Sequence, residues 1–304
     1  MDEILIVGTG ALATLFAARL SQTGLRVRML GRWKESIDSL NKNGAHIIDS
    51  NNIERAYPVQ ATDDPSDCDD AKFALVLVKA WQTEHAAHQL KECLAEDGIA
   101  LTLQNGLGNR ETLTQDLGPV RVATGVVTVG ATLLGPGSVR MAGNGIISLE
   151  RNPTLGPVKE ALESAKFKAH FAENIESAIW GKLVINTAIN PLTALLQIPN
   201  GELLKRPAAR ELMIELALET AAVANAQNIQ LPFENPVSAV EEVAQQTATN
   251  LSSMLQDVRR GAPTEIDAIC GAVTRLGKTH HMPMPVNATC WKLVKASSEI
   301  AQPM

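Results

Sequence analysis

Three polar residues recur at intervals of four in the mostly apolar stretch "WGKLVINTAINPLTALLQIPNGEL", residues 180–203. In an α-helix, Lys182, Asn186 and Asn190 share one face, each about 6 Å along the axis from the last. An ammonium and two amides can bind a carboxylate or hydroxyl, and a lysine can also donate a proton to a developing oxyanion. The stripe is either a solvated surface or a face that receives a polar ligand. Its apolar flanks favour the ligand-facing interpretation, because a helix apolar nearly all round is normally buried.

A second polar cluster lies in "NLSSMLQDVRRG", residues 250–261. Asn250, Ser253 and Asp257 are spaced by three and four residues, so a helix over 235–260 would place them on one face. Amide and hydroxyl donors on such a face are suited to the same kind of ligand as the lysine stripe.

A carboxylate follows in "APTEID", residues 262–267. Thr264 with Asp267 is typical of a helix start, which leaves Glu265 to point elsewhere. The alternative is that Glu265 also only favours a helix N-terminus. Spacing alone does not decide between the two.

The N-terminal stretch has the pattern of a dinucleotide-binding fold. The apolar run at 3–7 predicts a strand, "GTGALATLFAARLSQTG" (8–24) predicts a glycine turn and a helix, and 26–30 predicts a second strand. The turn matches the G-x-G-x-x-G/A fingerprint, in which the backbone and the helix N-terminus receive a pyrophosphate. A structural turn without a ligand is the weaker alternative. The candidate cofactor-binding residues in this turn are Gly8, Thr9, Gly10, Ala11, Leu12 and Ala13.

The end of the second strand bears on the choice of dinucleotide. NAD sites place an acidic residue there to accept from the ribose 2′-hydroxyl. Here the sequence reads "MLGRWKES", with Arg32 and Lys34 in place of an acid. A cation suits a 2′-phosphate, so NADP(H) is favoured over NAD(H). The alternative is that Arg32 is a solvated loop residue.

Two more candidates follow buried strands. "FALVLVKAWQ" (73–82) and "GIALTLQNGLGN" (98–109) are apolar runs that end at Lys79 and Asn105. Ligands of open α/β sheets bind beyond the carboxyl ends of the strands, so both residues are expected near cofactor and substrate. "NGLGN" is equally typical of a plain turn, which leaves the role of Asn105 open.

Composition excludes several classes of function. The chain has 304 residues, 45% hydrophobic, with a net charge of −6 and no basic run, which argues against nucleic acid or an anionic membrane as partner. No apolar run is long enough for a membrane span, and "MDEILIVGTG" lacks the basic start of a signal peptide. The four scattered cysteines predict reduced thiols in the cytoplasm, and no His or Cys spacing predicts a metal site.

The two halves of the chain differ in pattern. Residues 120–150 are β-rich and broken by Gly and Pro, as expected of hairpins that close a first domain. Helical periodicity follows at 174–196, 207–228, 235–260 and 262–281, and Pro191 is expected to break or bend the first of these helices. The prediction is an α/β protein with an N-terminal Rossmann-type NADP(H)-binding domain (1–170) and an all-α substrate-binding and catalytic domain (171–304), the substrate lying in the cleft between them.

Taken together, these motifs resemble the ketopantoate reductase (2-dehydropantoate 2-reductase) family over nearly the whole chain. The resemblance is carried by "GTGALA" (8–13), "VKAWQ" (78–82), "QNGLGN" (104–109), "WGKLVINTAINPLTAL" (180–195), "PNGEL" (199–203) and "SSMLQDVRRGAPTEID" (252–267). The glycine motif is generic to nucleotide-binding folds, whereas the long C-terminal motifs are specific to the family. Ala13 replaces a frequent third glycine, which the fingerprint tolerates.

The resemblance implies roles for the candidate residues. Lys182 matches the family's catalytic lysine, which contacts the keto oxygen, and Glu265 matches a glutamate near the cofactor and the substrate hydroxyls. Asn105 matches an asparagine where cofactor and substrate meet. Arg32 and Lys79 match positions that favour NADPH through its 2′-phosphate. The remaining substrate-binding residues implied are Asn186, Asn190, Asn250 and Ser253.

The function expected from this resemblance is the NADPH-dependent reduction of 2-dehydropantoate to (R)-pantoate, on the route to pantothenate and coenzyme A. Two alternatives stay open: a related reductase of another 2-keto acid, and a non-catalytic NADP(H)-binding sensor. The expected partner is a small anionic 2-keto acid, and the helical half could pair with a second copy to form a homodimer.

Overall fold

The structure is a computed structural model that describes residues 1–49, 51–68, 70–143 and 145–299. Two compact units make up the chain. The first comprises Met1–Gln104 and Asn109–Ile175, and the second comprises Asn105–Gly108 and Glu176–Met304. The sequence-based boundary between residues 170 and 171 stays a prediction.

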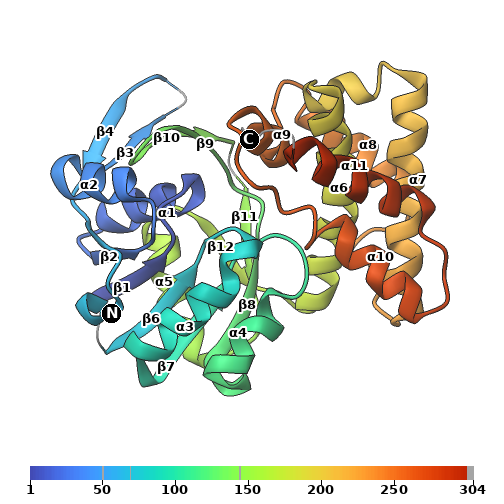
Figure 1. The fold of residues 1–304 in the computed structure, drawn as a ribbon. Helices are drawn as coiled ribbons and strands as arrows, with labels where there is room; N and C mark the ends of the chain where they lie inside the picture. Colours follow the sequence, from blue (N-terminus) through green and yellow to red (C-terminus); the bar gives the residue numbers. More distant parts are fainter. Residues whose placement is uncertain (50, 69, 144, 300–304) are drawn as a thin grey trace. The chain divides into compact units, whose positions relative to one another are not determined.

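An eight-stranded sheet forms the centre of the first unit, in the order β12-β11-β8-β7-β6-β1-β2-β5 (Figure 1). All neighbouring strands pair in parallel except β8 and β11, which are antiparallel. The predicted α/β class with a Rossmann-type N-terminal half is confirmed. The strands are β1 (Glu3–Val7), β2 (Arg26–Leu30), β5 (Gln60–Thr62), β6 (Ala71–Val76), β7 (Leu94–Thr102), β8 (Val122–Val127), β11 (Ile146–Leu149) and β12 (Lys168–Phe171).

Both faces of this sheet are buried, which explains its continuous apolar strands. Within β1, Ile4 and Ile6 belong to one core cluster, whereas Leu5 and Val7 belong to another on the opposite face. Helices α1 and α5 contribute to the first cluster, and α3 and α4 contribute to the second. The helices of this unit are α1 (Ala11–Ser21), α2 (Lys34–Asn43), α3 (Thr83–Cys93), α4 (Asn109–Leu117) and α5 (Gly156–Ser164), with short 3₁₀ helices η1 (Pro65–Cys68), η2 (Ala80–Gln82), η3 (Pro119–Arg121) and η4 (Pro153–Leu155).

The hairpin prediction for residues 120–150 is partly wrong. Among the described residues of this range (120–143 and 145–150), only β9 (Gly130–Gly135) and β10 (Ser138–Ala142) form a hairpin. It belongs to a separate four-stranded sheet with β3 (Ala45–Ile48) and β4 (Glu54–Tyr57). The flanking strand β8 instead continues the parallel sheet beside β7. Fully buried strands such as β8 do not show in the sequence which neighbour they will pair with.

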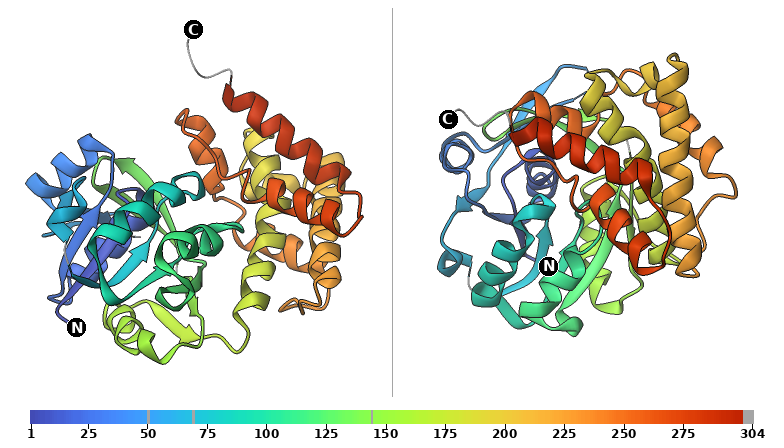
Figure 2. Two further views of the ribbon diagram at one scale, coloured as in Figure 1. Left: turned by 60° about the horizontal axis from the view of Figure 1, so that its bottom comes forward. Right: turned by 45° about the vertical axis from the view of Figure 1, so that its right-hand side comes forward.

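The second unit is built from helices (Figure 2). They are α6 (Ile175–Leu196), α7 (Pro207–Ala226), α8 (Pro236–Gln246), α9 (Ser253–Arg259), α10 (Cys270–Thr279) and α11 (Pro285–Glu299), with η5 (Asn200–Leu203) between α6 and α7. None of the helices in the described part of the chain combines the length and apolar character that a membrane span needs.

Three helix predictions in this unit need correction. Helix α6 runs through Pro191 to Leu196 without a break, because Pro191 is buried and its neighbours Ile189 and Leu192 pack in the core. The predicted helix 235–260 is divided into α8 and α9 by a turn, and the predicted helix 262–281 begins only at Cys270. Packing and turn hydrogen bonds outweigh helical periodicity at these points.

Candidate active site

The glycine turn after β1 has features that fit a pyrophosphate. Gly8 has a φ of 129°, and a Cβ there would lie 3.1 Å from the backbone carbonyl carbon of Leu77, so a larger residue would be strained. Gly10 has open space where its Cβ would be, and it precedes α1 without a side-chain cap. The first N–H groups of α1 are therefore available to an anion, and the turn fits a dinucleotide.

Two residues that support this turn were not predicted from the sequence. The buried hydroxyl of Ser36 in α2 donates to the carbonyl oxygen of Thr9 at 3.0 Å. Gly31 packs so closely on Thr9 that a Cβ would lie 2.7 Å from its methyl carbon. Only Gly31 carried a signal in the sequence, as a glycine directly after the second strand.

Arg32 lies at a pocket of about 420 Å³ in the first unit. It lies two residues after the end of β2, and its side chain is exposed. Residues of the segment after β5 and of α3 also line the pocket. The residues that line the pocket are Arg32, Asp63, Pro65, His85, Gln89 and Glu92. His85 had not been predicted as a site residue, because one histidine on an amphipathic helix gives no signal of its own.

Lys79 lies in the turn between β6 and η2, apart from the residues that line this pocket. Its backbone N–H donates to the side-chain oxygen of Gln82 at 3.3 Å. Gln104, just after β7, donates to the carbonyl oxygen of Val78 at 3.0 Å and to the hydroxyl of Thr83 at 2.8 Å. These bonds fix the turn that carries Lys79 at the carboxyl edge of β6 and β7.

Lys182 occupies α6 in the second unit, with Asn186 and Asn190 one and two turns further on. Burial lowers the pKa of Lys182 to about 8, and the nearby Glu265 carboxylate acts in the opposite direction. Asn190 is buried and Asn186 is half-buried. The polar stripe is thus a largely buried face, as the ligand-facing interpretation requires.

Asn105 contacts one of the catalytic candidates, Glu265, inside the second unit. Its side-chain amide donates to a carboxylate oxygen of Glu265 at 3.0 Å, across 160 positions of sequence. The segment Asn105–Gly108 belongs to this unit, and the N–H of Leu107 donates to the carbonyl oxygen of Ala268 at 2.9 Å. The turn is therefore more than a connection, because it places Asn105 against Glu265.

Gly106 makes this approach possible. Its φ is 80°, and a Cβ would lie 2.5 Å from the carbonyl oxygen of Ala268. We expect Gly106→Ala to displace Asn105 from Glu265, at a cost of about 1–3 kcal/mol in stability and a clear loss of activity. Thermal unfolding with steady-state kinetics measures both. Gly108→Ala is the matched control for backbone strain, since Gly108 has a φ of 94° but open space around its Cβ; equal activity losses in the two variants would contradict the packing argument.

The predicted face of Asn250, Ser253 and Asp257 is partly wrong. Asn250 lies in the turn before α9, where its carbonyl oxygen accepts from the N–H of Asn200 at 3.0 Å. Ser253 is the first residue of α9, and the residue before it, Ser252, caps the helix by accepting from the N–H of Leu255 at 3.1 Å. Serine is a preferred N-cap, so the sequence did carry a signal for this helix start.

The predicted helix start at Thr264 and Asp267 is also wrong. Helix α10 begins at Cys270, and Asp267 instead accepts from the indole N–H of Trp291 at 2.8 Å and from the ammonium of Lys295 at 3.2 Å, both on α11. Glu265 thus lies five positions before α10 and does not serve its N-terminus. The alternative that Glu265 only starts a helix is excluded.

The candidate residues fall into two groups, one in each unit. The second unit brings together Lys182, Glu265 and Asn105 through the contacts described above. It also carries Asn186, Asn190, Asn250 and Ser253, for which no mutual contact is described. The first unit holds the cofactor candidates Gly8, Thr9, Gly10, Ala11, Leu12, Ala13, Arg32 and Lys79.

Comparison with known proteins gives one consistent answer. Residues 4–154 match the family described as ketopantoate reductase PanE/ApbA, and residues 174–298 match its C-terminal counterpart. The 2-dehydropantoate 2-reductase of Archaeoglobus fulgidus is 34% identical over 300 residues, which cover 97% of each chain. That of Halobacterium salinarum is 31% identical and covers 96% of this chain and 98% of its own.

Solved structures show the same likeness. The PanE/ApbA family ketopantoate reductase of Ralstonia eutropha JMP134 superimposes with a TM-score of 0.92 at 30% identity, covering 99% of this chain and all of its own. D-mandelate dehydrogenase in its ternary structure with NADH and anilino(oxo)acetate has a TM-score of 0.90 at 25% identity, covering 98% and 99% of the two chains. The same fold therefore occurs in oxidoreductases with different names and ligands.

Proposed function

Because the chain belongs to the ketopantoate reductase (PanE/ApbA) family of oxidoreductases, we propose that it reduces 2-dehydropantoate to (R)-pantoate with NADPH, a step toward pantothenate and coenzyme A. The observation that carries the proposal is the cluster of Lys182, Glu265 and Asn105. A lysine whose pKa is lowered to about 8 is suited to donate a proton near neutral pH. Its carboxylate neighbour is held in place by an asparagine at 3.0 Å.

The residues of the first unit fit the cofactor. The open glycine turn and the uncapped start of α1 would hold the pyrophosphate, and Arg32 would hold the 2′-phosphate, with Lys79 as a second cation. NADPH, when bound, supplies the hydride. The absence of an acidic residue directly after β2 supports NADPH over NADH.

Lys182 acts on the keto oxygen of the substrate. Reduction of the keto carbon opens the carbon–oxygen double bond and leaves negative charge on that oxygen, which the ammonium stabilises. A proton then passes from Nζ of Lys182 to the oxygen, giving the hydroxyl of the product and a neutral amine. Glu265 keeps the lysine protonated, because its negative charge raises the pKa that burial lowers.

Polar side chains on α6 and around the start of α9 would orient the substrate. Amides and hydroxyls can bind its carboxylate and its terminal hydroxyl without adding charge. We assign this task to Asn186, Asn190, Asn250 and Ser253, with Asn105 at the point where substrate and cofactor meet. Hydride transfer needs the two reactants in contact, so the reacting complex requires the cofactor of the first unit to meet the substrate of the second, in an interdomain cleft.

The test is the loss of NADPH absorbance with purified protein and ketopantoate, run beside NADH and other 2-keto acids. Turnover confined to NADPH and ketopantoate supports the proposal. The likeness to D-mandelate dehydrogenase favours a second candidate, the reduction of a different 2-oxo acid by the same chemistry. Faster turnover of such an acid would replace the proposed substrate, and NADPH binding without any turnover would favour the sensor alternative.

Removal of the Arg32 guanidinium should shift the cofactor preference. We expect Arg32→Ala to raise KM for NADPH by about 10–100-fold, because the variant loses a charge-assisted hydrogen bond to the 2′-phosphate. KM for NADH should change little. Steady-state kinetics with both cofactors measures the ratio. Arg26→Ala is the matched control, because Arg26 is an exposed arginine at the other end of β2. An equal rise for both cofactors would contradict a role in 2′-phosphate recognition.

We place the enzyme in the cytoplasm, where its cysteines would stay reduced. Four cysteines are buried and none of them forms a disulfide: Cys68, Cys93, Cys270 and Cys290. Burial raises the pKa of Cys290 to about 11. Thiols in that state are inert. The homodimer stays a prediction, and gel filtration with light scattering tests it.

A further inference from the structure

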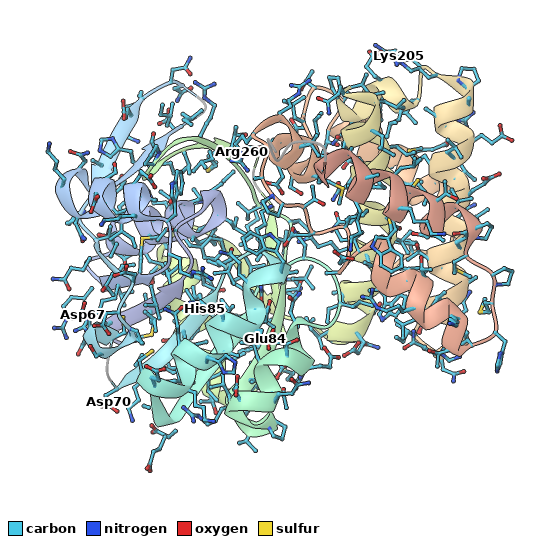
Figure 3. The ribbon with its side chains drawn as sticks, in the orientation of Figure 1. Asp67, Asp70, Glu84, His85, Lys205 and Arg260 are labelled. Atoms are coloured by element: carbon cyan, nitrogen blue, oxygen red, sulfur yellow. The ribbon has the colours of Figure 1, made fainter. Side chains whose placement is uncertain are left out.

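The pocket beside Arg32 contains a second basic group that the proposed function does not use. His85 lies in the first turn of α3 (Figure 3). It lines the pocket together with Arg32. The two residues come from different elements, since Arg32 follows β2. Their shared pocket places a titratable imidazole next to a permanent cation, an arrangement suited to an anion.

The pocket is built at the carboxyl edge of two paired strands. β2 and β5 are parallel neighbours that end with Leu30 opposite Thr62, and the N–H of Gly31 donates to the carbonyl oxygen of Thr62 at 3.0 Å. Arg32 lies two residues after β2 and Asp63 one residue after β5, on the edge where ligands of such sheets bind. Helix α3 supplies His85, Gln89 and Glu92, which share one helix face at spacings of four and three.

The charges of the residues that line this pocket indicate a role for His85 in binding an anion. Arg32 faces two carboxylates, Asp63 and Glu92, so the lining is net negative when His85 is neutral. Among the side chains that line the pocket, a dianionic phosphate would then meet one guanidinium against two repelling carboxylates. Protonation of His85 makes the lining neutral and adds a second donor for the phosphate oxygens.

The surroundings of His85 favour its neutral form in the free protein. Burial lowers the pKa of His85, and the charges of Arg32 and His88 lower it further. His88 is one turn along α3 and pairs with Asp116 of α4 at 2.8 Å. A bound phosphate acts in the opposite direction, because an anion near an imidazole favours its protonated form.

We propose that His85 is a proton-dependent recognition residue for the 2′-phosphate of the cofactor, so that the preference for NADP(H) over NAD(H) strengthens as pH falls. This inference rests on the proposed use of NADPH. Binding raises the pKa of His85, so the complex takes up a proton. The gain in affinity is fully present below the pKa of the free protein and is lost as pH rises through the pKa of the complex.

The test compares two probes that differ only in the 2′-phosphate, adenosine 2′,5′-bisphosphate and 5′-AMP. Their affinities are measured by calorimetry on the full-length wild type and His85→Gln between about pH 5 and pH 8. We expect the wild type to prefer the bisphosphate more strongly than the variant at low pH, and the two preferences to converge at high pH. At low pH, the preference of the wild type for the bisphosphate should exceed that of the variant by about tenfold for each unit by which binding raises the pKa of His85. Ionisation of the phosphate itself affects both proteins alike and cancels between them.

Two further variants sharpen the comparison. His85→Arg carries its charge at all these pH values, so its preference for the bisphosphate should stay high where that of the wild type declines. His170→Gln is the matched control, an exposed histidine on β12 outside the pocket lining, and should keep the pH dependence of the wild type. Equal preference in wild type and His85→Gln at every pH would overturn the inference and leave the NADPH proposal intact. Equal affinity of the wild type for both probes would overturn the NADPH proposal itself.

Discussion

Lys182→Ala should lower kcat by about 10²–10⁴-fold, the usual effect of removing a positioned proton donor. NADPH binding should be unchanged, because the cofactor candidates of the glycine turn and Arg32 lie in the other unit. The same residue predicts the pH dependence. Proton donation needs the ammonium, so kcat/KM should fall as pH rises through about 8, the pKa that burial gives Lys182.

The controls separate chemistry from folding. Lys182→Arg keeps a cation but cannot release a proton near neutral pH, so it should stay slow and lose the alkaline decline. Lys205→Ala removes an exposed lysine of the same unit (Figure 3). Lys205 pairs with Glu202 at the surface, so the activity of the variant should match the wild type. Wild-type turnover in Lys182→Ala, with folding verified by circular dichroism, would exclude the lysine as proton donor.

Substitution of Glu265 should have the second largest effect on activity. Two variants separate the effect of its charge from that of its hydrogen bond with Asn105. Glu265→Gln keeps an oxygen that can accept from Asn105 but removes the charge that raises the pKa of Lys182. The alkaline decline of kcat/KM should therefore move to a pH below about 8. At alkaline pH, each unit of that shift costs up to about tenfold in rate.

Glu265→Ala removes the hydrogen bond as well. We expect a further loss worth about 1.5–3 kcal/mol in transition-state stabilisation, because Asn105 loses its charged acceptor. Glu211→Gln, at an exposed glutamate of α7, is the control and should leave the pH profile in place. A pH profile of Glu265→Gln identical to that of the wild type would contradict the coupling between Glu265 and Lys182.

Local signals made the first 30 residues predictable. The strand at 3–7, the glycine turn, the helix and the strand at 26–30 all appear as expected, because one short unit carries its own turn chemistry and buried faces. Lys182, Asn186 and Asn190 were equally predictable, since they share one helix and their spacing fixes their common face.

The sequence pattern could not predict the long-range contacts. The bond between Asn105 and Glu265 joins residues 160 positions apart, and periodicity has no information at that range. The break between α8 and α9 has a similar origin. Its turn is held by the N–H groups of Asn200 and Gly201, which donate to Asn250 and Ala248 at 3.0 and 3.1 Å. The uninterrupted course of α6 through Pro191 was not predicted, because a proline inside a helix costs about 3 kcal/mol. Core packing of the neighbouring residues offsets this cost.

The assignment of residues 105–108 to the second unit has a consequence for recombination between relatives. The segment interrupts the first unit between β7 and α4, so the chain passes from one unit to the other at 104/105, 108/109 and 175/176. A chimera joined once near residue 175 would combine the Asn105 turn of one parent with the Glu265 and Ala268 of the other. Such hybrids should work only where the parents agree at Gly106 and Ala268, and exchange of residues 105–108 together with the helical half should restore those that fail. The second unit is thus encoded by two separate segments of the chain.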